Sequence, residues 1–315
     1  MSDVDRGSHT RAVWTALLVT ALWSSSWVLI RIGLDDEGLP PITFAGLRYS
    51  VAAVVLVAWA GCRRSVRSEV RSLSSATWRP LVALGIVYYA VTQGAQFVAI
   101  DSQPAATSSL MLAPTPFLVA VLSQYSIGEA VRSRQIVGAA LIVVGAFVYF
   151  AGDLGATVVG MIASVIGLSA NVTGSLLGRS VNRREQLSPL TVTATTMPIG
   201  AILLLGAGMV VEGVPRLGWA AVGVIVWLAV VNTAWAFTLW NLSLRRLAAV
   251  ESAAINNTML IQIALLAWIF LGEAPGIVGG IGIVVVSIGA LLAQGVRFDR
   301  RRPRPRRNRD RRRPG

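Results

Sequence analysis

The sequence has little charge for its length and contains no lysine. Only 14% of its 315 residues are charged, whereas roughly 25% is usual for a soluble domain. All 28 basic residues are arginines. A phosphate-binding loop of the GxxxxGK type requires a lysine, so the composition excludes a chain that hydrolyses ATP at such a loop.

Cysteine and histidine are equally scarce. Cys62 is the single cysteine and His9 the single histidine, which excludes an internal disulfide and a zinc site built from these ligands. We therefore expect no metal and no cofactor. No Asp or Glu lies near the middle of an apolar run, and Glu251, at the end of one, comes closest. An enzyme active within a membrane needs a nucleophile, a metal cluster or an acid–base pair at that depth, so we expect no enzyme.

Apolar residues are abundant. They make up 54% of the chain, and the mean hydropathy is +0.65. A helix crosses a bilayer with about 20 mostly apolar residues. Runs of that kind fall at 12–32, 42–61, 80–100, 105–124, 135–152, 156–177, 189–211, 219–241, 251–271 and 275–294. The sequence therefore predicts an all-α integral membrane protein with ten transmembrane helices.

The arginines are distributed unevenly between the two sides of such a protein. If the N-terminus is cytoplasmic, the inner segments before residue 296 hold 14 arginines and the outer segments hold two, Arg31 and Arg216. This bias predicts that both termini are cytoplasmic. We expect residues 1–11 to form a cytoplasmic tail and 296–315 to form an Arg-rich disordered tail that contacts membrane lipid. Nucleic acid is not an expected partner.

A duplicated segment organises the chain. The stretch "IGEAVRSRQIVGAALIVVGAFVY" (127–149) and the stretch "LGEAPGIVGGIGIVVVSIGALLA" (271–293) share six identical positions at an offset of 144. At an offset of 148, "LPPITFAG" (39–46) aligns with "LSPLTVTA" (187–194). We therefore divide the chain into two repeats, 12–152 and 153–295. Each has five spans, so the second copy enters the membrane from the opposite side, an arrangement common among secondary transporters.

These residues carry a family resemblance. "ALWSSSWVLIRIGL", "LPPITFAGLRYSVAA" and the "GEA" that opens the last span of each half resemble the EamA-type repeats of the drug/metabolite transporter superfamily, over about residues 13–294. The resemblance implies a central cavity lined by spans 1, 3, 4, 6, 8 and 9, with spans 5 and 10 as outer supports. Together with the positive-inside pattern, it implies a multi-pass protein of the bacterial inner membrane.

Polar and aromatic side chains within the spans are the candidates for contact with a solute, because a solute that crosses lipid must exchange its water for such groups. The alternative for each is a contact between helices. The predicted cavity residues are Trp23, Trp27, Tyr89, Gln93, Gln96, Asn171, Asn232, Trp235, Ser252, Asn256 and Gln262.

Five further residues have predicted gating or structural roles. Arg48 lies inside the second span, and we expect it to reach outward to Asp35, Asp36 and Glu37 as an anchor or an outer-gate ion pair, with substrate contact as the alternative. Pro114 and Pro116 should kink or unwind the fourth span, either beside a site or for packing alone. Glu129 and Glu273 should each lie in a turn, at the N-terminus of the next helix.

The sequence therefore predicts a secondary transporter, an exporter or exchanger of a small neutral or zwitterionic metabolite such as an amino acid, working by alternating access. The absence of a central carboxylate argues against tight proton coupling. A non-transporting sensor or assembly protein and a multidrug exporter are the alternatives. The sequence leaves open the substrate, the direction of transport, the coupling ion or exchange partner, the role of the arginine tail and the oligomeric state, a monomer being allowed.

Overall fold

The computed structural model is helical throughout the part of the chain that it describes. The described residues are 3–115, 117–119, 121–122, 133–151, 155–182, 187–236, 239–240, 243, 247 and 249–293. Pro116, Glu129 and the tail at 296–315 lie outside them, as does the side chain of Ser252. Within the described part there is no strand, which confirms the predicted all-α class.

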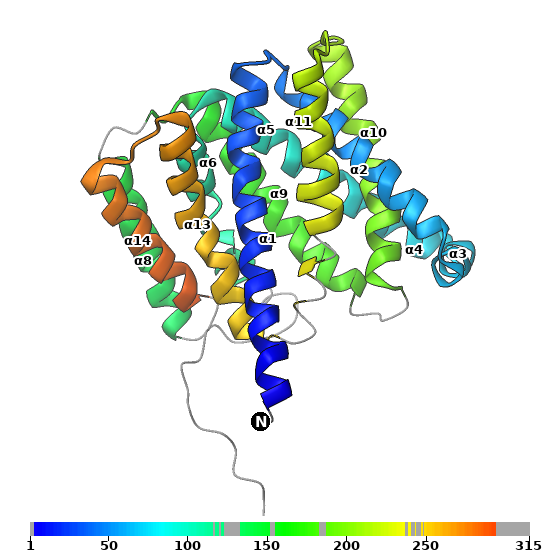
Figure 1. Cartoon of the computed structure of the whole chain (residues 1–315), viewed down its shortest axis with the longest axis horizontal. Coiled ribbons are helices and arrows are strands. Elements are labelled where there is room, and N and C mark those ends of the chain that lie inside the picture. Colours follow the sequence, from blue (N-terminus) through cyan, green and yellow to red (C-terminus); the bar gives the residue numbers. More distant parts are fainter. Residues whose placement is uncertain are drawn as a thin grey trace, which may run out of the picture.

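The helices form one assembly in which segments distant in sequence lie side by side (Figure 1). They are α1 (Asp3–Asp35), α2 (Pro41–Gly61), α3 (Arg64–Arg71), α4 (Ser75–Leu84), η1 (Gly85–Val91), α5 (Thr92–Ser102), α6 (Ala105–Met111), α8 (Ser133–Phe150), α9 (Val158–Asn182), α10 (Pro189–Val211), α11 (Trp219–Ala229), η2 (Val230–Trp235), α13 (Ala249–Leu271) and α14 (Gly276–Ala293). The helix α1 begins at Asp3, so most of residues 1–11, the expected N-terminal tail, belong to that helix.

Five segments in the described part of the chain are long and apolar enough to cross a membrane, by length and composition. They are His9–Asp35, Pro41–Gly61, Ser75–Ser102, Val158–Gly178 and Pro189–Val211. Four shorter apolar helices accompany them, at Ile136–Tyr149, Trp219–Trp235, Thr258–Leu271 and Gly276–Leu292. These nine segments fall on nine of the ten predicted runs. The tenth run, 105–124, is only partly described.

The two duplicated glycine-rich segments pack against each other as α8 and α14, at one edge of the molecule (Figure 1). A methyl group on Gly282 would lie 2.6 Å from the backbone nitrogen of Tyr149, and one on Gly289 would lie 2.7 Å from the carbonyl oxygen of Gly138. The higher residue numbers of one helix thus meet the lower numbers of the other, so the pair is antiparallel. Glycine is required along this seam because the backbones touch.

The helices α2 and α10 form a second antiparallel pair, and a glutamate caps the N-terminus of each. At the start of α2, Glu212 accepts hydrogen bonds from the backbone nitrogens of Ile42 (3.1 Å) and Thr43 (2.8 Å). At the start of α10, Glu69 accepts from the Ser188 backbone nitrogen (2.8 Å) and the Thr191 hydroxyl (2.5 Å). A carboxylate is favourable at a helix N-terminus, where backbone N–H groups lack partners.

Two helical segments contain a π-helical turn, η1 between α4 and α5 and η2 after α11. In each, a threonine hydroxyl donates to the carbonyl five residues earlier, Thr92 to Val87 at 2.9 Å and Thr233 to Leu228 at 2.9 Å. The hydroxyl thereby satisfies a carbonyl that the wider turn displaces from the regular ladder. Such turns are frequent at functional sites.

Candidate functional site

A cavity of about 260 Å³ lies between α1, the region of α6, α9 and α13. Its described lining residues are uncharged, with apolar walls and a few hydroxyl and amide groups. The residues are Trp27, Ser109, Leu112, Ala113, Thr115, Asn171, Asn256, Met259, Leu260 and Ile263. Of the predicted cavity residues, the structure therefore brings Trp27, Asn171 and Asn256 together here.

The break after α6 shapes one wall. The helix ends at Met111, and residues 112–114, which include Pro114, form a turn. A proline removes a backbone donor and obstructs the preceding turn of a helix, which accounts for a break at this point. Beyond the turn, the Thr115 hydroxyl accepts a hydrogen bond from Asn171 Nδ2 at 3.3 Å, and donates to the carbonyl of Leu112 at 2.7 Å. Asn256 lines the cavity, and its side chain is exposed.

A smaller pocket continues from the cavity along α5 and α9. Trp27 and Leu112 line both spaces, and the other residues of the small pocket are Thr92, Gln96, Ala99, Ser108, Ala163, Ser164 and Gly167. Its volume of about 10 Å³ is at the lower limit for one water molecule. Gln96, also a predicted cavity residue, is therefore placed in this second space, across Trp27 from the larger cavity.

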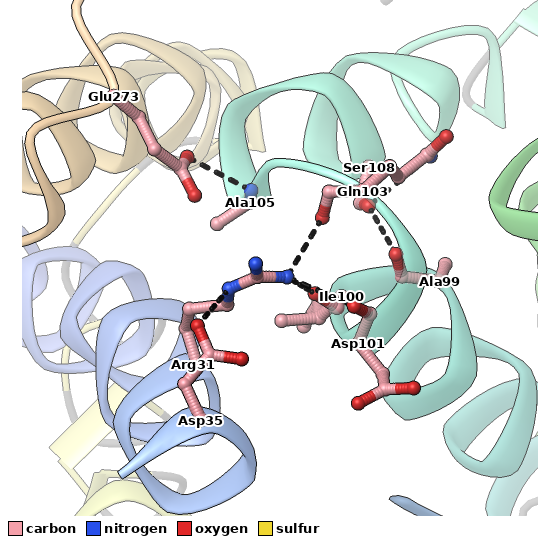
Figure 2. Close-up of polar contacts among 9 residues, drawn as sticks. All are labelled: Arg31, Asp35, Ala99, Ile100, Asp101, Gln103, Ala105, Ser108 and Glu273. Atoms are coloured by element: carbon pink, nitrogen blue, oxygen red, sulfur yellow. Dashed lines mark hydrogen bonds and ion pairs between the residues drawn. The ribbon is translucent and has the colours of Figure 1, made fainter. Parts of the chain in front are cut away.

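Beyond the small pocket, at the end of α1 and the junction of α5 with α6, polar contacts join the helix ends (Figure 2). We call these contacts the closure. Gln103 is 2% exposed, and its Nε2 donates to the hydroxyls of Ser108 (3.2 Å) and Ser164 (3.1 Å). The guanidinium of Arg31 donates to the carbonyls of Ile100 and Asp101, the latter at 3.0 Å. These contacts bind α1, α5, α6 and α9 together at one end.

Two carboxylates complete this closure. Asp35 Oδ2 lies 2.7 Å from Arg31 Nε and orients the guanidinium (Figure 2). Glu273 accepts a hydrogen bond from the backbone nitrogen of Ala105 at 3.0 Å, so it caps α6 rather than α14, the helix that the sequence suggested. Burial raises the pKa of the Glu273 carboxyl, although the neighbouring backbone N–H groups and Arg31 oppose that rise. Gly272, with a φ of +71°, ends α13 in the left-handed region and lets the chain turn toward α6.

Three predicted cavity residues instead join helices. Trp23 Nε1 donates to the carbonyl of Asn232 at 3.1 Å, and Asn232 Nδ2 donates to the carbonyl of Leu22 and to the Ser25 hydroxyl, which connects α1 to η2. Gln262 Nε2 donates to Thr20 (3.2 Å) and Thr258 (2.9 Å), while its Oε1 accepts from Ser24 (3.1 Å), which connects α1 to α13.

The remaining predicted residues lie elsewhere. Gln93 accepts from the Tyr49 hydroxyl at 2.6 Å, and Tyr89 packs edge-on against Tyr49, with ring centroids 6.0 Å apart. Trp235 is 49% exposed and lines neither of these two pockets. The described part of the Ser252 residue is its backbone in α13.

Arg48 is 5% exposed and does not make the expected contact with the acidic residues near the end of α1. Its guanidinium lies 5.3 Å from the ring centroid of Tyr49 and 5.9 Å from that of Phe97, and Nη2 donates to Thr233 at 3.4 Å. Asp35 pairs with Arg31, four residues away on the same helix. Aromatic faces attract a desolvated cation, so Arg48 connects α2 to α5 and η2.

Several residues of this region were not predicted from the sequence. Gln103 directly precedes Pro104 and looks like an ordinary loop residue, and Arg31 looks like a charge that ends a span. Ser108 is the counterpart of Ser252 at the offset of 144, and this correspondence was the one available signal. The closure depends on backbone carbonyls, which sequence patterns do not reveal.

A helical, multi-pass membrane protein with an uncharged polar cavity between its helices has the architecture of a membrane transporter. Residues 10–151 and again 156–294 match the EamA-like transporter family. The chain belongs to that family, in agreement with the resemblance noted from its motifs.

Relatives across bacteria carry transporter names. A "Probable terminal-alkyne amino-acid exporter" of Streptantibioticus cattleyicolor is 30% identical over 93% of this chain and 96% of its own length. A "Probable amino-acid metabolite efflux pump" of Escherichia coli is 24% identical over 73% and 77%. The "S-adenosylmethionine/S-adenosylhomocysteine transporter" of Chlamydia trachomatis is 25% identical over 88% and 87%. A crystal structure with 22% identity superimposes with a TM-score of 0.63 over 91% of this chain and 96% of its own, which supports the fold.

Proposed function

We propose that the protein is a secondary transporter that exports or exchanges a small neutral or zwitterionic metabolite, such as an amino acid, by alternating access. The uncharged polar cavity between α1, α6, α9 and α13 is the observation that carries this proposal. Its volume of about 260 Å³ is below the roughly 300–1,000 Å³ typical of drug-sized sites, which favours a small metabolite over a multidrug substrate. The names of the amino-acid exporter and efflux relatives agree with it.

We further propose ten spans arranged as two inverted repeats of five. The antiparallel packing of α8 on α14 and of α2 on α10 supports this arrangement, because equivalent helices of inverted repeats run in opposite directions. The reciprocal glutamate caps and the two π-helical turns repeat in the same way. In this topology both termini face the cytoplasm, and the residues of Figure 2 lie on the outer side.

The closure around Arg31 and Glu273 then acts as the outer gate. In this proposal, the contacts of Arg31 and Glu273 correspond to a closed outer gate, and the exposed Asn256 lies on the inner side of the cavity. Opening requires the Arg31 and Glu273 contacts to separate, and Trp27, between the two pockets, lies on the path. Since the described cavity lining holds no carboxylate, exchange or uniport fits better than proton coupling through a cavity carboxylate.

Counterflow in proteoliposomes tests this function. Vesicles loaded with an unlabelled amino acid should accumulate the labelled one. The variants Asn256→Ala and Asn171→Ala should each raise the half-saturating concentration about tenfold, which corresponds to a loss of about 1.4 kcal/mol of binding free energy. Ser169→Ala is the matched control, since Ser169 is exposed on the same helix as Asn171. Absence of counterflow across amino acids, sugars and drugs would favour the sensor or assembly alternative. Saturable flux of large hydrophobic drugs alone would favour a multidrug exporter.

A further inference from the structure

The short helix α3 has two chemically different faces. Arg64, Arg67 and Arg71 are three to four residues apart and therefore lie on one side of the helix. With Ser68 and Ser72 they line an open depression on the molecular surface. Both serine hydroxyls donate to backbone carbonyls, those of Ser65 and Glu69, so the arginines are the donors available to a ligand in this depression.

The opposite face of α3 attaches the helix to the ends of two apolar helices. Val66 is 5% exposed and packs with Ala60 at the end of α2 and Ala194 near the start of α10. The helix therefore lies where these helices leave the hydrocarbon region. Trp59, two residues before the end of α2, is 39% exposed. The guanidinium of Arg63 lies over its ring, 4.7 Å from the ring centroid to Cζ. A half-exposed tryptophan near a span end is typical of the membrane interface.

The acidic residue of α3 does not neutralise the three arginines. Glu69 turns away from them and accepts hydrogen bonds from Ser188 and Thr191 of α10. In the part of the chain that the structure describes, Arg31 and Asp35 form an ion pair, and no ion pair involves Arg64, Arg67 or Arg71. Among the described residues, no carboxylate therefore pairs with these three exposed guanidinium groups.

We propose that this face of α3 is a binding site for the phosphate headgroup of an anionic phospholipid, such as phosphatidylglycerol. Guanidinium groups bind phosphate oxygens through paired hydrogen bonds, and a surface arginine is attracted to anionic lipid. The seating of α3 at the end of α2 brings the site to the level of the headgroups, so the ligand is a lipid rather than a soluble anion. The Glu69 contact holds α3, and with it the proposed site, against α10.

Thermal unfolding of the detergent-purified full-length protein tests this site. Added phosphatidylglycerol should raise the unfolding temperature more than phosphatidylcholine does. In the triple variant Arg64→Gln, Arg67→Gln, Arg71→Gln, the concentration that gives half of the shift should rise about fivefold for each arginine removed. The control triple variant Arg11→Gln, Arg79→Gln, Arg216→Gln removes the same charge from exposed positions outside α3 and should keep the wild-type response.

Two further measurements make the result decisive. The variant Arg64→Lys, Arg67→Lys, Arg71→Lys keeps the charge and should respond between the wild type and the glutamine variant, because lysine lacks the paired donors. Inorganic phosphate and glycerol phosphate should leave the unfolding temperature unchanged. An undiminished lipid response in the glutamine variant, an equal response to inorganic phosphate, or displacement of the lipid by RNA would each overturn the proposal.

Discussion

Gln262 shows why a polar residue within a span is ambiguous when the sequence is the only guide. Gln262 lies six residues after Asn256, which at 3.6 residues per turn places the two side chains about a third of a turn apart around α13. Its amide is bound to Thr20, Ser24 and Thr258. Asn256, by contrast, lines the cavity and is exposed. The residue type indicates that a partner is needed, and the neighbouring helix decides whether that partner is protein or solute.

At Gln262 we expect a loss of stability rather than of substrate affinity. Gln262→Leu removes two hydrogen bonds between α13 and α1 and one within α13. Each polar contact contributes about 0.6 kcal/mol in a membrane bundle, so the free energy of unfolding should fall by about 1–2 kcal/mol. Thermal unfolding in detergent measures this. The half-saturating concentration in counterflow should change less than in Asn256→Ala, and an equal change would place Gln262 in the binding site.

Glu69 gives the α3–α10 connection a pH dependence. The hydrogen bonds from Thr191 and Ser188 hold the pKa of its carboxyl below the ordinary value of 4.5. A carboxyl with a lowered pKa stabilises the fold above its unfolded-state pKa and loses that contribution as the pH falls through the folded-state value. Wild type should therefore exceed Glu69→Gln in unfolding temperature at pH 7, and the difference should shrink below pH 4.5. A difference that stays constant over this range would contradict the expectation.

At the scale of helices, the sequence predicted nine segments well, because long apolar runs and the prolines at the first position of α2 and α10 mark their positions. The duplication places glycines at matching positions of α8 and α14, Gly138 with Gly282 and Gly145 with Gly289. It did not reveal that the two copies pack against each other. The π-helical turns had no recognisable signal in the sequence. The hydroxyls of Thr92 and Thr233 donate to carbonyls five residues back, a contact that the sequence alone does not reveal.

The glycine seam can be tested within one helix. Gly282→Ala places a methyl group 2.6 Å from the Tyr149 backbone nitrogen, and such overpacking costs about 1–3 kcal/mol. Gly280, two residues earlier, has open space at that position, so Gly280→Ala should be neutral or stabilising by up to about 1 kcal/mol. Unfolding temperatures of both variants give the comparison. Equal effects would mean that α8 and α14 do not pack as described.

For the molecule as a whole, the sequence predicted the family and the uncharged character of the cavity, and the latter is visible in the described lining. Of the predicted cavity residues whose side chains the structure describes, only three line the larger cavity. The others lie elsewhere because the resemblance specifies which helices converge but not how each helix is rotated about its axis. Arg48 shows the same limit, since its burial against Tyr49 and Phe97 depends on the packing of three helices.

The single native cysteine allows a direct test of topology. Cys62 is exposed after α2, and in the proposed arrangement it faces the cytoplasm. A membrane-impermeant maleimide should leave it unmodified in intact spheroplasts and label it after lysis. In a Cys62→Ser background, Ala156→Cys should react in intact spheroplasts, because residue 156 is exposed before α9 on the other side. Labelling of both positions from one side would rule out the inverted arrangement.

Apart from the ion pair of Arg31 with Asp35, the contacts of Arg31 and Glu273 in Figure 2 fall on main-chain atoms, among them the carbonyls of Ile100 and Asp101 and the amide of Ala105. Contacts with main-chain atoms do not depend on the side chains of the residues contacted. In the proposed outer gate, substitutions at these positions could therefore change which solutes enter while Arg31 and Glu273 keep their main-chain partners.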